Sequence, residues 1–149
     1  MNLSEIREKL LDQHANLRQI AGRADGLLEQ VRQKKAGAKE ALHNIAAELE
    51  SAFSRHNQEE EMLLKDIIST IDAWGPTRHD LMDYHHTVEH AVLRTTLSVA
   101  LKESDAMAAA DRFEQVLHHL LDHMREEEEH ILNANVLCDD CCTIDSFSG

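Results

Sequence analysis

The amino-acid sequence predicts an all-α protein, an up-down-up-down antiparallel four-helix bundle. The 149 residues include one proline, five glycines and 3% aromatic side chains among many Ala, Leu, Glu and Gln, a composition typical of long helices. Apolar residues also recur at helical spacing in four long segments, whose connections are so short that they can only reverse the chain. Consecutive helices should therefore be antiparallel neighbours that bury one shared core.

Four helices fit a single domain of this length. We expect them over residues 4–35, 39–72, 78–102 and 106–136. Pro76 and Thr77 offer a stop and an N-cap before the third helix, and Ser104 or Asp105 offers a cap before the fourth. Residues 1–137 should form the bundle. Residues 138–149 show no helical period and should form a flexible tail that carries the three cysteines, Cys138, Cys141 and Cys142.

Charge and hydropathy exclude several classes of partner. The formal net charge is −13, which argues against nucleic acid, because phosphate recognition needs clustered Lys and Arg. No apolar run has the length of an export signal or a membrane span, so we expect no membrane partner and a cytoplasmic location. The cysteines lie too close together to be a disulfide framework. They could bind a soft metal, respond to oxidation or be inert.

The second segment carries two ionisable residues inside an apolar stripe. The stripe consists of Leu42, Ile45, Leu49, Phe53, Leu63, Ile67 and Ile71. His56 and Glu60 lie in the middle of that face, one above the other at i,i+4 spacing. Burying two such groups is costly unless a partner satisfies them, and a metal ion satisfies both together.

The other three segments carry similar residues. His14 lies on the apolar stripe of the first segment, His86 and His90 share one side of the third, and His123 and Glu127 lie at the edge of the stripe of the fourth. Helix rise places them within roughly 12 Å of a common depth in an antiparallel bundle. Seven ligands exceed what one ion needs, and imidazole with carboxylate is more typical of non-heme iron than of structural zinc. The predicted metal ligands are His14, His56, Glu60, His86, His90, His123 and Glu127.

These motifs resemble the hemerythrin-like family, also called the histidine-histidine-glutamate cation-binding domain, over nearly the whole chain up to Leu137. The family has a histidine on helix one, His-x3-Glu on helix two, His-x3-His on helix three, and a histidine with a carboxylate four or five residues later on helix four. Every position is filled here. The oxygen carriers of the family use an aspartate five residues after the last histidine, whereas this chain offers Glu127 and Glu128. We favour Glu127, with Glu128 as the alternative.

The resemblance implies a cofactor of two iron ions. Glu60 and Glu127 would bridge them, and His14 and His56 would leave one ion with an open position for O2, peroxide or nitric oxide. His86, His90 and His123 would complete the other ion. The implied function is binding of O2 or a related diatomic for carriage or sensing, rather than catalysis. The alternatives are an oxidoreductase acting on peroxide or nitric oxide, and an iron storage or sensing protein.

Two further features stay open at the level of the sequence. His79 and His130 each lie seven residues from a predicted ligand, and they could be a polar pair at the bundle mouth, a gate or a third, weaker metal site. The third segment also carries an apolar stripe nearly opposite His86 and His90, so either this stripe packs against a second copy in a homodimer or the helical phase expected for the segment is wrong. This stripe consists of Leu81, Tyr84, Val88, Val92 and Val99.

Overall fold

The computed structural model describes residues 1–68, 88–135 and 137. The helices are α1 (Leu3–Arg32), α2 (Ala38–Ile68), α4 (His90–Lys102) and α5 (Ala106–His130). No strand occurs among these residues, so the predicted all-α class is confirmed. None of the described helices combines the length and the apolar composition needed to cross a membrane.

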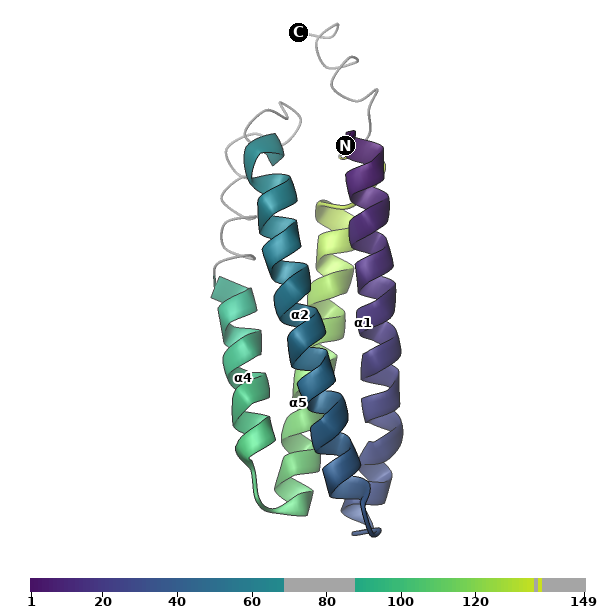
Figure 1. Cartoon of the computed structure of the whole chain (residues 1–149), viewed down its shortest axis with the longest axis vertical. Helices are drawn as coiled ribbons and strands as arrows, with labels where there is room; N and C mark the ends of the chain where they lie inside the picture. The colour runs from purple at the N-terminus through teal and green to yellow at the C-terminus, as the bar shows by residue number, and fades with distance from the viewer. Residues whose placement is uncertain (69–87, 136, 138–149) are drawn as a thin grey trace, which may run out of the picture.

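The four helices pack side by side around one axis (Figure 1). α1 lies against α2 and α5, and α4 lies against α5 and α2. The short connections between α1 and α2 and between α4 and α5 reverse the chain, as Figure 1 shows. The predicted up-down-up-down topology also requires the connection from α2 to α4. That connection consists of residues 69–87, which lie outside the described residues.

Helix boundaries follow local capping. Asn2 and Glu5 form a reciprocal capping box at the start of α1, in which the Asn2 side chain accepts from the backbone N–H of Glu5 at 2.8 Å. The Asp105 carboxylate accepts from the backbone N–H of Ala108 at 2.9 Å and caps α5. Between α1 and α2, Gly37 has a φ of 78°, a conformation that glycine adopts without strain. The predicted starts of the first and fourth helices are thus explained by caps.

The predicted end of the fourth helix was wrong. α5 ends at His130 rather than at Val136. After this helix, Leu132 and Leu137 are each 1% exposed and pack in one cluster with Ile6, Leu10 and Leu64. The Nε of Arg7 on α1 donates to the backbone oxygen of Leu132 at 2.7 Å. Burial of each such side chain stabilises the fold by about 1.5–3 kcal/mol, which outweighs one more helical turn in solvent.

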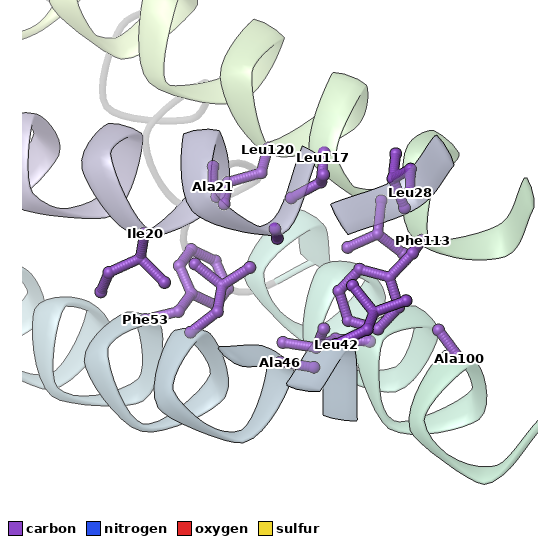
Figure 2. Close-up of a cluster of buried hydrophobic side chains, with 14 of the residues drawn as sticks. Ile20, Ala21, Leu28, Leu42, Ala46, Phe53, Ala100, Phe113, Leu117 and Leu120 are labelled. Atoms are coloured by element: carbon purple, nitrogen blue, oxygen red, sulfur yellow. The ribbon is translucent and has the colours of Figure 1, made fainter. Parts of the chain in front are cut away.

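Two apolar clusters lie on either side of a polar layer. The larger cluster joins all four described helices, and Figure 2 shows Ile20, Phe53, Phe113 and Leu117 within it. The smaller cluster consists of Ile6, Leu10, Leu64, Ile131, Leu132 and Leu137. The buried polar side chains of the described residues belong to positions between the two clusters along α1, α2 and α5, or to the first turn of α4. They are His14, His56, Asn57, Glu60, His90, His123 and Glu127.

Candidate metal centre

The first group of possible ligands brings together α1, α2 and α5. It consists of His14, His56, Glu60 and Glu127, whose ligand atoms all lie within 4.8 Å of one another. The Nε2 atoms of His14 and His56 are 3.2 Å apart. The Nε2 of His56 lies 2.7 Å from Glu60 Oε2, and that of His14 lies 3.3 Å from Glu127 Oε2. All four residues are at most 3% exposed, so these atoms meet away from solvent.

The second group joins α4 to α5. It consists of His90, His123 and Glu127, again with ligand atoms within 4.8 Å of one another. The Nε2 atoms of His90 and His123 are 2.8 Å apart. The Nε2 of His90 lies 3.2 Å from Glu127 Oε1, and the Nε2 of His123 contacts the same oxygen. One carboxylate oxygen of Glu127 therefore faces each group, so that Glu127 is shared between them.

The spacing of these atoms fits metal ligands. Two ligand atoms bound to one ion at about 2.0–2.2 Å, with an angle of about 90–110°, lie about 2.8–3.6 Å apart. These separations between ligand atoms of the two groups run from 2.7 to 3.3 Å. Larger separations would require the helices to shift before an ion could contact several ligands. The two buried histidine–glutamate groups can thus hold metal ions.

Hydrogen bonds at the outer edges of the imidazoles support the same conclusion. The Nδ1 of His14 lies 3.2 Å from a Glu128 oxygen, and the Nδ1 of His56 lies 2.7 Å from Gln13 Oε1. Both partners accept, so each Nδ1 carries the proton. In the neutral rings, the two Nε2 lone pairs then face one another at 3.2 Å. Such an arrangement needs a cation or a proton between the nitrogens, because a second lone pair cannot satisfy the first.

Glu128, the alternative ligand, contacts the outer edge of His14 instead of joining either group. Its carboxylate accepts from Arg18 at 2.6 and 2.7 Å. Burial raises the pKa of Glu128, but the hydrogen bonds from Arg18 and His14 outweigh it and lower the pKa overall. Glu128 is therefore a charged acceptor that orients the His14 ring.

The turn before α4 supplies a second acceptor of this kind. Val88 and Glu89 form a wider π-helical turn directly before His90. The Glu89 carboxylate lies 2.9 Å from the Nδ1 of His123 and so directs the Nε2 of that ring toward Glu127. A carboxylate that accepts from the outer nitrogen fixes the tautomer and makes the ring a better electron donor.

The charges of the centre are strongly coupled. Burial raises the pKa of Glu127, but hydrogen bonds from His123, His14 and His90 hold it well below its usual range. Burial lowers the pKa of His123, yet contacts first with Glu127 and then with Glu89 raise it to about 9. Burial lowers the pKa of His14, but Glu127, Glu60 and Glu128 together raise it overall. Without metal, the centre consequently binds protons that an incoming cation would have to displace.

Six of the seven predicted ligands lie in the two groups. His86 lies outside the described residues, as do His79, Leu81, Tyr84 and the three cysteines. His130 is exposed and belongs to neither group, so the predicted pairing with His79 is untested.

Sequence reasoning missed the residues that surround the ligands. Gln13 and Glu89 directly precede His14 and His90, but polar residues on long helices usually indicate a solvated face. Asn57, next to His56, was also missed. It is 4% exposed, and neither polar atom of its side-chain amide has a hydrogen-bond partner in the part of the chain that is described. The sequence did contain a signal for Asn57, because this polar residue is in phase with the apolar stripe of the second segment.

Comparisons of the chain with family models, with curated proteins and with solved structures returned no match. The resemblance to hemerythrin-like proteins therefore depends on the motifs and stays a prediction.

Proposed function

We propose that the chain is a hemerythrin-like protein, an up-down-up-down antiparallel bundle that holds two iron ions and binds O2 or a related diatomic for carriage or sensing. The observation that carries the proposal is the shared carboxylate of Glu127, which offers one oxygen to each of two groups of buried imidazoles. Two adjacent groups with one common ligand suit a pair of ions. Nitrogen and oxygen donors without a thiolate are typical of non-heme iron.

Each ion would be held by one group. His14, His56 and Glu60 would hold the first, His90 and His123 the second, and Glu127 both. His86 is proposed to complete the second ion, and Glu60 to contribute a bridge, as the resemblance implies. Two ferrous ions would supply the two electrons that reversible reduction of O2 requires, which side chains alone cannot do.

The surroundings of the groups favour binding of a small apolar ligand. Leu10 and Leu64 lie one turn beyond His14 and Glu60 on one side, and Leu17 and Phe53 lie on the other. These side chains are nearly fully buried, so they exclude water from the centre. Exclusion of water strengthens the contacts of the ligands and slows the loss of a reactive bound species.

The test combines metal analysis with spectroscopy. Protein purified from cells grown with ample iron should contain two iron ions per chain. The ferrous protein should give a stable absorption band with O2 that disappears when the gas is removed. Rapid bleaching with consumption of peroxide or nitric oxide would instead support the oxidoreductase, and iron uptake without either response would support storage. Absence of stoichiometric metal would refute diatomic binding, the oxidoreductase and iron storage alike.

We also propose that the protein self-associates through the outer face of the third predicted helix. Val88, Val92 and Val99 are each 44–45% exposed, whereas valine is usually buried. Leu81 and Tyr84, the other members of this predicted stripe, lie outside the described residues. Sedimentation of the wild type and of a Val92→Asp, Val99→Asp variant tests the proposal, since only the variant should be monomeric. The expected cytoplasmic location is likewise part of the proposal.

A further inference from the structure

His56 differs from His14 and His123 in how its outer edge is held. The Nδ1 atoms of His14 and His123 face carboxylates, whereas the Nδ1 of His56 faces the neutral amide of Gln13. Gln13 in turn donates through Nε2 to Glu59. Glu59 also pairs with Lys9 at 3.3 Å, so a short chain of polar groups connects the protein surface to a predicted metal ligand.

Glu59, at the outer end of this series of hydrogen bonds, determines which groups donate and which accept. The Glu59 carboxylate pairs with the ammonium group of Lys9 and receives a hydrogen bond from Gln13. A carboxylate paired with a lysine only accepts, so the amide nitrogen of Gln13 must face it. The amide oxygen then faces His56 at 2.7 Å and accepts from Nδ1. The Nε2 lone pair of His56 is left pointing at the group formed with Glu60 and His14.

We propose that Gln13, held by Glu59, is a positioning residue that fixes the ring and the tautomer of His56 for metal binding. The inference rests on the metal centre of the proposed function. It assigns to Gln13 the role that Glu128 and Glu89 have for the other two rings, but with a neutral acceptor. His56 should therefore donate less electron density than His14 or His123.

The surroundings of Gln13 explain why the Nδ1 of His56 needs an acceptor that is held in place by a second residue. A cavity of about 170 Å³ between α1 and α2 is lined by Gln13, Asn16, Leu17, Ala52, Arg55, His56 and Glu59. Arg55 is exposed, and the Glu59 side chain is 38% exposed, so the cavity borders solvent. Water can reach the outer edge of His56 and would compete for Nδ1 if the amide were absent. An amide anchored at both ends holds one orientation, which a mobile water does not.

The first experiment measures metal affinity in the full-length protein. Zn²⁺ or Co²⁺ is titrated into metal-free wild type, Gln13→Leu, the exchange variant Gln13→Glu with Glu59→Gln, and the control Gln58→Leu. Gln58 is an exposed glutamine on α2. Gln13→Leu should bind about 10–100-fold more weakly, the usual effect of removing a group that orients a ligand. The exchange variant keeps the net charge and gives His56 a carboxylate acceptor, so its affinity should be at least that of the wild type. Gln58→Leu should bind as the wild type does.

The second experiment reads out the His56 ring itself. In zinc-loaded protein with labelled histidine, the Nδ1–H of His56 should give a protected NMR signal in the wild type and in the exchange variant. In Gln13→Leu that proton should exchange with water, while those of His14 and His123 stay protected. A variant that lost affinity only through unfolding would lose all three signals and its helical circular dichroism.

The possible outcomes separate the two proposals. If the wild type binds no metal, the metal centre is wrong and the role of Gln13 falls with it. If the wild type binds metal and Gln13→Leu binds equally well with an unchanged His56 signal, only the role of Gln13 is refuted. Should Gln13→Leu fail to fold, the exchange variant decides, because a loss of affinity or of the His56 signal there also overturns the inference.

Discussion

Metal binding to the metal-free protein should strengthen as pH rises, up to about pH 9. His123 is the cause, because its pKa of about 9 means that it holds a proton at neutral pH. The groups that hold the proton there are Glu127 on the same helix and Glu89 and His90 at the start of α4. A metal ion must displace this proton before it can bind the ring.

The size of the effect follows from the pKa. Displacement of one proton changes the apparent affinity about tenfold per pH unit below the pKa, so affinity at pH 7 should be about 100-fold lower than its plateau above pH 9. This corresponds to about 3 kcal/mol. The raised pKa of His14 can add a second proton and steepen the dependence. Above about pH 9 the affinity should level off, since His123 is then neutral.

Stability of the metal-free protein should show the opposite trend. The pKa of His123 rises from 6.5 to about 9 on folding, so its contribution is complete below pH 6.5 and is lost as pH rises through 9. The difference amounts to about 3 kcal/mol. Thermal melts should therefore fall with pH for the metal-free protein but not for the metal-loaded protein.

The assay is competition for Co²⁺ against a chelator of known affinity, repeated at intervals from about pH 6 to about pH 10, with proton release measured in weak buffer. A His118→Ala variant, changed at an exposed histidine on the same helix, serves as control and should behave as the wild type. Affinity that does not change between pH 7 and pH 9 would refute the assignment of a protonated His123 at this centre.

Three further predictions concern single residues. His56→Ala should lower bound iron and destabilise the bundle, because loss of one ligand strands the others; unchanged iron content by metal analysis would defeat its assignment. Glu127→Gln should reduce bound metal from two ions per chain to one or none, while Glu126→Gln, at an exposed neighbouring position, should keep both. Gly26→Ala should raise the free energy of unfolding by about 0.5–1 kcal/mol in denaturant titrations, since an added Cβ meets no atom within 4 Å and the helix interior gains propensity. A destabilised Gly26→Ala variant would indicate a contact on that face.

Much of the fold and six of the predicted ligands could be read from the sequence because helical spacing is a local property. His56 and Glu60 had to share a face of α2 once the apolar stripe was identified, and the structure brings them together. The choice between Glu127 and Glu128 was harder, because adjacent residues differ by only 100° around a helix. In the structure, α5 packs against α1 so that Glu127 belongs to both groups and Glu128 accepts from Arg18.

Other features depended on contacts that no local pattern encodes. The sequence pattern predicts a helix as far as residue 136, yet α5 ends at His130, and Ile131 and Leu132 pack with buried residues of α1 and α2. Gln13 and Glu89 show their roles only when a second helix presents His56 or His123 beside them. Residues that orient candidate ligands are therefore visible only in the tertiary structure, whereas the candidate ligands themselves can be predicted from periodicity.

The burial of Leu137 links the C-terminal segment covalently to the smaller apolar cluster. Leu137, the last described residue, is packed into the same small cluster as Leu10 and Leu64. Those two leucines lie one helical turn from His14 and Glu60. Cys138 follows Leu137 directly in the sequence, so the segment that carries the three cysteines begins one residue after a side chain that packs beside the candidate metal centre.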